Sequence, residues 1–142
     1  MTQTTLRSTV QAFYEAFGEG DLDAAMAVFA DDVRVTDPDL GTVEGRVALR
    51  GYLNGLKAPL PDARADIERT FEAGDTVIVE GRFRGTNTGP LAGPDGELPP
   101  TGRAVDLPFA DFSQLSEGKI VEYRTYYDQA TLFTQLGLEE ES

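Results

Sequence analysis

The stretch that decides the fold is residues 103–137, which read RAVDLPFADFSQLSEGKIVEYRTYYDQATLFTQLG. Residues 103–115 and 119–127 read as two strands, because β-branched and aromatic residues recur in both and a short Ser-Glu-Gly turn joins them. A short helix is expected over residues 129–136, ended by Gly137. The C-terminal third therefore predicts an antiparallel hairpin followed by a closing helix.

A second hairpin is predicted immediately upstream. Residues 62–71 alternate along the chain, with Ala63, Ala65, Ile67 and Phe71 expected on one face, which is typical of a strand. Residues 76–85 alternate as well, and Ala73-Gly74-Asp75 supplies the turn between them. A Gly/Pro-rich loop is expected from 86 to 102, and one short strand earlier, at 33–36. These strands predict an antiparallel sheet.

The N-terminal part predicts helices. Leu6, Val10, Phe13 and Phe17 recur at helical spacing within residues 5–17, and an apolar stripe of this kind packs against a core. Two more helices are expected, over 22–29 and 47–56. Helices segregated from an antiparallel sheet indicate an α+β fold. We expect one domain spanning residues 1–142, in which three N-terminal helices close the concave face of a curved sheet around a cone-shaped pocket, with residues 138–142 as a frayed tail.

Composition excludes several kinds of site. The 142 residues carry 25 acidic and 12 basic side chains, for a formal charge of −13, and include neither cysteine nor histidine. Thiolate catalysis, histidine bases and the usual zinc ligands are therefore excluded, and we expect no metal. Acid–base chemistry falls to Asp, Glu, Tyr or Lys. A polyanion is repelled by nucleic acid and anionic lipid, and no apolar stretch predicts a signal peptide or membrane helix, so a cytoplasmic protein is expected.

Several motifs resemble one known family. Residues 14–23 (YEAFGEGDLD) and 29–33 (FADDV) resemble the opening of nuclear-transport-factor-2-like domains, and 37–46 (DPDLGTVEGR) resembles a corner of that fold. The segments GTNTGPL (85–91) with LPPTGR (98–103), and the ending YDQATLFTQLG (127–137), resemble the SnoaL-like polyketide cyclases. The resemblance covers nearly the whole chain.

The resemblance implies an activity and a catalytic residue. Studied members of this branch close a ring by intramolecular aldol condensation without metal or cofactor, and an aspartate matching Asp128 serves them as acid/base. Two positions depart from the branch, since Asn87 and Thr36 stand where histidine is frequent. Relatives of this fold commonly form dimers through the convex sheet face, so a homodimer is expected by resemblance.

Residues 29–38 also resemble ketosteroid isomerases, whose catalytic base matches Asp37. Their oxyanion tyrosine would fall at Phe13, beside Tyr14, and their protonated aspartate falls near Ala110 or Asp111. This second resemblance keeps isomerase or hydrolase chemistry centred on Asp37 as an alternative.

Each candidate polar residue has a structural and a functional interpretation. Asp128 is either the N-cap of the last helix or a pocket-facing acid/base. A period of two places Arg124 and Tyr126 on the same strand face as Asp128; if that face is inward, Arg124 needs an acidic partner such as Asp111 and could bind a substrate oxyanion.

The remaining candidates are treated in the same way. Asp37 precedes a proline and is either a turn former or a base on the pocket floor. Asn87 either holds a substrate oxygen or braces the loop backbone. Aromatic side chains form chiefly core, and some are expected to line the cavity: Phe13, Phe17, Tyr52, Phe83 and Tyr126.

Together these observations predict a cofactor-independent acid/base enzyme acting on a hydrophobic, carbonyl-bearing small molecule. The alternatives are a binding module that carries or senses an apolar ligand, and the chemistry centred on Asp37. The sequence leaves the three open.

Overall fold

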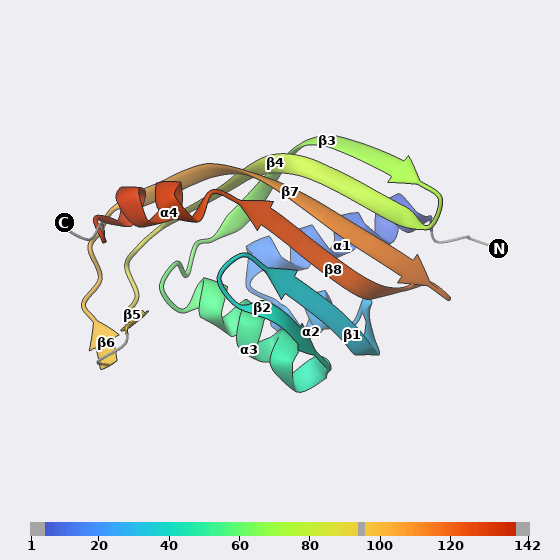
Figure 1. Cartoon of the computed structure of the whole chain (residues 1–142), viewed down its shortest axis with the longest axis horizontal. Helices are drawn as coiled ribbons and strands as arrows, with labels where there is room; N and C mark the ends of the chain where they lie inside the picture. Colours follow the sequence, from blue (N-terminus) through green and yellow to red (C-terminus); the bar gives the residue numbers. More distant parts are fainter. Residues whose placement is uncertain (1–4, 94–95, 139–142) are drawn as a thin grey trace.

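The computed structural model describes residues 5–93 and 96–138, and its main feature is a curved sheet of six strands in the order β2-β1-β8-β7-β4-β3 (Figure 1). The strands are β1 (Phe29–Asp37), β2 (Gly41–Glu44), β3 (Arg64–Ala73), β4 (Thr76–Thr86), β7 (Ala104–Ser116) and β8 (Lys119–Tyr127). All neighbouring pairs are antiparallel except β1 and β8, which run parallel. The expected α+β class is confirmed, with a mixed rather than purely antiparallel sheet.

Four helices accompany the sheet in the described part of the chain: α1 (Leu6–Glu19), α2 (Leu22–Met26), α3 (Arg46–Lys57) and α4 (Gln129–Leu136). Thr5 caps α1, and Gly20 ends it in the left-handed conformation, which glycine adopts without steric cost. The prediction of a helix from 22 to 29 was too long: α2 ends at Met26, and Phe29 already opens β1.

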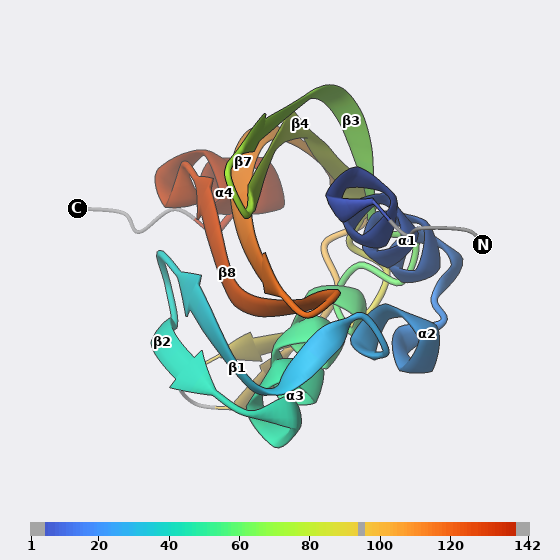
Figure 2. The ribbon, with the colours of Figure 1, turned by 90° about the vertical axis from the view of Figure 1, so that its right-hand side faces the viewer.

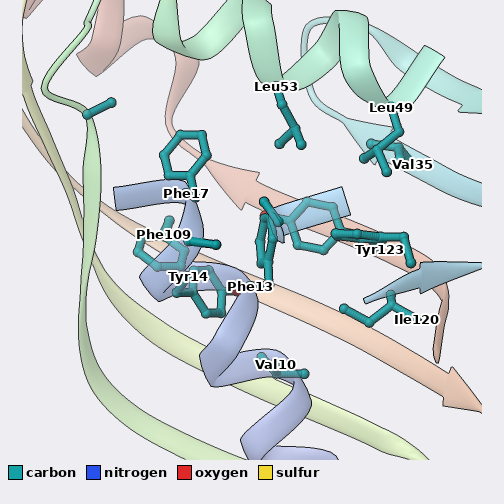
Figure 3. Packing of buried hydrophobic residues seen from close by; sticks show 14 of the residues in the cluster. Val10, Phe13, Tyr14, Phe17, Val35, Leu49, Leu53, Phe109, Ile120 and Tyr123 are labelled. Carbon is teal, nitrogen blue, oxygen red and sulfur yellow. The ribbon is translucent and has the colours of Figure 1, made fainter. Parts of the chain in front are cut away.

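Helices α1 and α3 lie on the concave side of the sheet (Figure 2). Figure 2 shows β3, β4, β7 and β8 curling around α1, with α3 closing the lower side. Phe13, Tyr14 and Phe17 extend from α1, and Leu49 and Leu53 from α3, into one apolar layer against the sheet (Figure 3). The core thus consists of helix side chains packed on the concave face of the sheet, with Phe13 within 6.3 Å, centroid to centroid, of four aromatic rings.

Irregular strand pairing interrupts the alternation of the sheet, and in β3 it changes a predicted face. The register of β3 against β4 shifts between Ile67 and Arg69, and a bulge of this kind reverses the direction of the following side chains. Phe71 consequently lies opposite Ile78 on the outer face and is 47% exposed, so the prediction that Ile67 and Phe71 share a face was wrong. A second shift, between Gln114 and Leu115, affects β7 and β8.

The predicted loop 86–102 contains some regular structure. Strands β5 (Leu91–Gly93) and β6 (Gly96–Leu98) pair with each other as a short arm beside the main sheet (Figure 1). Of the tail predicted for 138–142, only Leu138 belongs to the described residues, and its N–H donates to the Phe133 carbonyl. Among the described residues no helix is long and apolar enough to cross a membrane.

Candidate active site

A cavity lies between the helices and the concave face of the sheet. Its volume is about 70 Å³, and its wall is mostly apolar. The wall consists of Phe13, Tyr14, Phe17, Tyr52, Leu53, Leu56, Ala65, Phe83, Leu107, Phe109, Asp111, Tyr123, Thr125, Tyr127 and Leu132. An apolar pocket with a few converging polar groups is typical of a small-molecule site.

Asp111 is the carboxylate in this wall. It lies on the inward face of β7 and is 2% exposed. The hydroxyl groups of Tyr14 and Tyr123 both donate to its Oδ2, at 2.6 and 2.7 Å, short distances of the kind found when the acceptor is charged. Its second oxygen, Oδ1, is buried and makes no hydrogen bond to any described residue. One oxygen is therefore held firmly by two tyrosines, and the other can bind a ligand or a proton. The Thr125 hydroxyl group, opposite Asp111 on β8, makes no hydrogen bond to Oδ1 but is near enough to favour the charged carboxyl group.

Burial raises the pKa of the Asp111 carboxyl group from its usual 3.8 to about 6. Desolvation is the largest cause, and the nearby charge of Asp37 acts in the same direction. The hydroxyl groups of Thr125, Tyr14 and Tyr123 oppose the shift because they favour the charged form. A carboxyl group with this pKa exchanges protons readily near neutral pH.

A second carboxylate–tyrosine cluster lies at the end of β1. Asp37 is buried and accepts hydrogen bonds from the hydroxyl groups of Tyr52 and Tyr127, at 3.1 and 3.3 Å. Its Oδ1 also accepts from the backbone N–H groups of Asp39 and Leu40, at 2.7 and 3.2 Å. Four donors thus surround this carboxylate, two of which fix the Asp-Pro turn.

The tyrosines act as hydrogen-bond donors and not as bases. Burial, followed by the neighbouring carboxylates, raises the pKa of Tyr14, Tyr52, Tyr123 and Tyr127 above the usual value of 10. Four of the five tyrosines in the chain therefore donate protons in hydrogen bonds to two buried aspartates. Of the groups in the cavity wall, Asp111 is the one whose protonation state changes near pH 6.

Half of the predicted site residues lie in the cavity wall, and the other half lie outside the wall. Phe13, Phe17, Tyr52, Phe83 and Asp111 line the cavity. Asp37 lies behind the wall, bound to two tyrosines that line it.

The inward orientation considered for Arg124, Tyr126 and Asp128 was wrong. On β8 the odd-numbered residues Tyr123, Thr125 and Tyr127 line the cavity, and the even-numbered ones point outward. Tyr126 is 46% exposed, and its ring stacks edge-on against Phe112 on the outer face, where Arg124 also lies over Phe112.

Asp128 is exposed and caps α4. Its carboxylate accepts from the N–H groups of Ala130 and Thr131, at 3.0 and 3.3 Å. This geometry gives Asp128 the structural role of a helix N-cap, and no cavity contact accompanies it.

Asn87 braces the loop backbone. Its side chain is fully buried; the amide nitrogen donates to the carbonyls of Pro59 and Gly89, and the amide oxygen accepts from the N–H and hydroxyl of Thr101. All of its hydrogen-bonding capacity is used within the chain. Of the two interpretations of Asn87, the structure therefore shows the structural one.

Sequence reasoning missed Tyr14, Tyr123, Thr125 and Tyr127 as wall residues. A signal for Tyr14 was present, because it follows Phe13, the position that matches the oxyanion tyrosine of ketosteroid isomerases. The signal for the β8 residues was ambiguous, since both faces of residues 123–127 carry an aromatic residue.

Comparisons with known proteins agree with this architecture. The model of the family described as "SnoaL-like domain" matches residues 10–123. A structure of a candidate SnoaL-like polyketide cyclase from Jannaschia sp. CCS1 superposes with a TM-score of 0.83 at 22% identity, covering 99% of both chains. IdmH, a candidate polyketide cyclase from Streptomyces antibioticus, superposes with a TM-score of 0.80 at 28% identity, covering 94% of this chain and 99% of its own. A candidate polyketide cyclase from Pseudomonas putida KT2440 gives 0.78 at 22% identity, covering 94% and 99%. The family match spans most of the chain, and the protein belongs to the SnoaL-like domain family.

Proposed function

We propose that the protein is a cofactor-independent acid/base enzyme that moves a proton next to a carbonyl group of a hydrophobic small molecule, with Asp111 as the acid/base. The observation that carries this proposal is the free Oδ1 of Asp111, buried in an apolar cavity while the other oxygen is fixed by two tyrosines. A fixed carboxylate with a pKa near 6 can accept a proton and return it.

The proposed reaction is a ring closure in which Asp111 first removes a proton and later returns it. Asp111 Oδ1 takes a proton from the carbon next to a carbonyl, and the electron pair of the broken C–H bond moves to the carbonyl oxygen as an enolate. The enolate carbon then attacks a second carbonyl of the same molecule, forming a C–C bond and an alkoxide. The alkoxide takes the proton back from Asp111, so the reaction leaves the enzyme unchanged.

Tyr52 and Tyr127 are the donors available to the enolate oxygen. Their hydrogen bonds to Asp37 are 3.1 and 3.3 Å, longer than those that Asp111 receives, so these hydroxyl groups lose less when they turn to a substrate. Donors aimed at a developing oxyanion in a water-poor site supply a large part of catalysis. Asp37 serves here as the group that positions them, because its carboxylate already accepts four hydrogen bonds.

Hydrogen–deuterium exchange tests the proposal without knowledge of the natural substrate. The wild-type protein in D₂O should accelerate exchange at the α-carbon of 2-tetralone, followed by proton NMR. Asp111→Asn should reduce this rate by about 10²-fold or more, the range of general acid–base catalysis, and Asp128→Asn should retain it. Exchange at the uncatalysed rate in the wild type, or full exchange in Asp111→Asn, would contradict the proposal.

We further propose that two copies pair through the outer face of the sheet. Phe71, Ile78 and Phe112 lie directly opposite one another across β3, β4 and β7, and Tyr126 packs against Phe112. The acidic side chains around this row are paired with arginines: Asp66 with Arg84, Glu80 with Arg69, Asp106 with Arg82 and Glu122 with Arg124. An apolar row with balanced charges can meet its own copy across a two-fold axis, although the chain as a whole is strongly negative.

A further inference from the structure

The cavity has a negative electrostatic character, which selects the charge of a ligand as well as supplying the base of the proposed function. Asp111 lies in its wall, and Asp37 lies close enough behind it to raise the pKa of Asp111. No lysine or arginine is among the described residues that line the cavity. Lys57 lies over the ring of Phe17, a wall residue, and donates to the Ala63 carbonyl, but is not itself part of the wall. A negative ligand would therefore meet two buried carboxylates without compensation.

The hydrogen-bonding capacity of the wall is equally one-sided. All four tyrosine hydroxyl groups around the cavity already donate to Asp111 or Asp37. The unpartnered carboxylate oxygen is an acceptor, Oδ1 of Asp111, which is buried and adjoins the cavity. The wall also contains the hydroxyl group of Thr125, opposite Asp111 on β8, which favours the charged form of the carboxyl group. A ligand that reaches this oxygen satisfies it only by bringing a donor of its own.

The rest of the wall presents aromatic rings. Phe13, Tyr14 and Tyr123 surround the carboxylate, with Phe13 at 4.9 Å from Tyr14 and 5.7 Å from Tyr123 between ring centroids, and Phe109 lies 6.3 Å from Tyr14. Aromatic faces attract cations through their quadrupoles, most strongly where water is excluded. The carboxylate and the aromatic rings thus both favour a positively charged ligand.

We infer that the cavity binds small organic ammonium ions, whose N–H group donates to Asp111 Oδ1 while their alkyl groups pack against Phe13, Tyr14 and Tyr123. The cavity volume of about 70 Å³ holds roughly five water-sized groups, so an ammonium head with a short branched chain fills it. This ligand class goes beyond the proposed function: it needs the negative charge of Asp111 and no catalysis, and the ammonium ion competes with any carbonyl substrate for the same oxygen.

The pH dependence follows from the groups that face Asp111. They are Tyr14 from α1, Tyr52 from α3, Asp37 from β1 and Tyr123 from β8. Thr125, opposite on β8, and Val79, opposite on β4, carry no charge. The tyrosines stay neutral across the range in which Asp111 titrates. Ammonium binding should therefore follow the ionisation of Asp111, weakening as the pH falls through about 6.

Three probes of nearly equal size test the inference: isobutylammonium, isobutanol and isobutyrate, titrated into the ¹⁵N-labelled protein and followed by NMR shifts. At pH 7.5 isobutylammonium should bind at least about tenfold more tightly than isobutyrate, with isobutanol between them. Its affinity should fall about tenfold between pH 7.5 and pH 5, because only about one tenth of Asp111 remains ionised at pH 5.

Two variants, each lacking one carboxylate, test whether the ammonium preference and its pH dependence come from Asp111. Asp111→Asn keeps an oxygen for the two tyrosine donors and should remove both the preference for ammonium and its pH dependence. Asp31→Asn removes a charge from a side chain that is 97% exposed, and should preserve both. Equal or tighter binding of isobutyrate, a preference that does not change with pH, or equal losses in the two variants would overturn the inference. Isotope exchange in 2-tetralone without ammonium binding refutes this inference alone, whereas ammonium binding without exchange refutes only the proposed function.

Discussion

The hydroxyl group of Tyr14, on the first helix, donates a 2.6 Å hydrogen bond to Asp111, which lies 97 residues later on β7. Both side chains are buried, so the bond joins helix and sheet at the cavity and is shielded from water. Tyr123 donates to the same oxygen from β8 at 2.7 Å. The two tyrosines fix the orientation of the carboxylate and make no hydrogen bond to its other oxygen, and both the proposed function and the proposed ammonium ligand depend on this arrangement.

Replacing Tyr14 with Phe should raise the pKa of Asp111 above its value of about 6. The lost hydrogen bond favours the charged form, so its removal makes the proton harder to lose. The variant should also be less stable by about 1–2 kcal/mol, because a buried charged acceptor loses one donor. A ¹³C NMR titration of the Asp111 carboxyl carbon and chemical denaturation measure the two effects. Tyr126→Phe, on the outer face, is the matched control and should change neither; an unchanged Asp111 pKa in Tyr14→Phe would contradict the assigned contact.

The raised pKa of Asp111 predicts how stability depends on pH. The folded state holds this proton up to about pH 6, whereas the unfolded chain releases it near 3.8. The folded state therefore binds more protons in this window, and the stabilisation, complete below about pH 3.8, is lost as the pH rises through 6. For a shift of about two units the loss is about 3 kcal/mol. The free energy of unfolding of wild type minus that of Asp111→Asn should fall by this order between pH 4 and pH 8. A flat difference would show that Asp111 titrates normally.

The sequence predicted the fold well because its main features are local. The alternation of residues 76–85, the hairpin turns and the glycine-ended helices depend on neighbouring residues alone, and the observed elements agree closely with them. The parallel pairing of β1 with β8 could not be predicted in this way, because it joins segments about 90 residues apart whose own patterns do not specify a partner.

The site was harder to predict because the face of a strand is a tertiary property. On β8, residues 123–127 read YRTYY, so both faces carry a tyrosine and the alternation does not decide which is inward. The burial of Tyr123 against Phe13 and Phe29 decides it. Asp128 illustrates the same limit: a strand-to-helix aspartate suits both a cap and a catalytic role, and only its exposure and its two backbone contacts distinguish them.

Two glycine substitutions should have opposite effects on stability. A Cβ atom at Gly89 would lie 1.8 Å from the Ala58 carbonyl oxygen, so Gly89→Ala forces two backbone segments apart and should cost about 1–3 kcal/mol. At Gly51, within α3, an added Cβ meets no atom within 4 Å, and Gly51→Ala should stabilise the helix by about 0.5–1 kcal/mol. Chemical denaturation of both variants checks the pair. Equal stability of Gly89→Ala and wild type would show that the backbone at Gly89 is not held against Ala58, after α3.

A charge on the outer face should separate the proposed pair of chains. Tyr126 lies beside Phe112 at the middle strands of the sheet and is 46% exposed, so Tyr126→Glu places an uncompensated charge where two apolar rows would meet. Leu40→Glu is the matched control, because Leu40 is 50% exposed but lies in the turn before β2. Sedimentation equilibrium should give twice the mass of one chain for the wild type and for Leu40→Glu, and the mass of one chain for Tyr126→Glu. A wild type that sediments as one chain would refute the pairing, and a Tyr126→Glu variant that still pairs would move the interface away from this face, because a buried unpaired carboxylate is too costly to tolerate there.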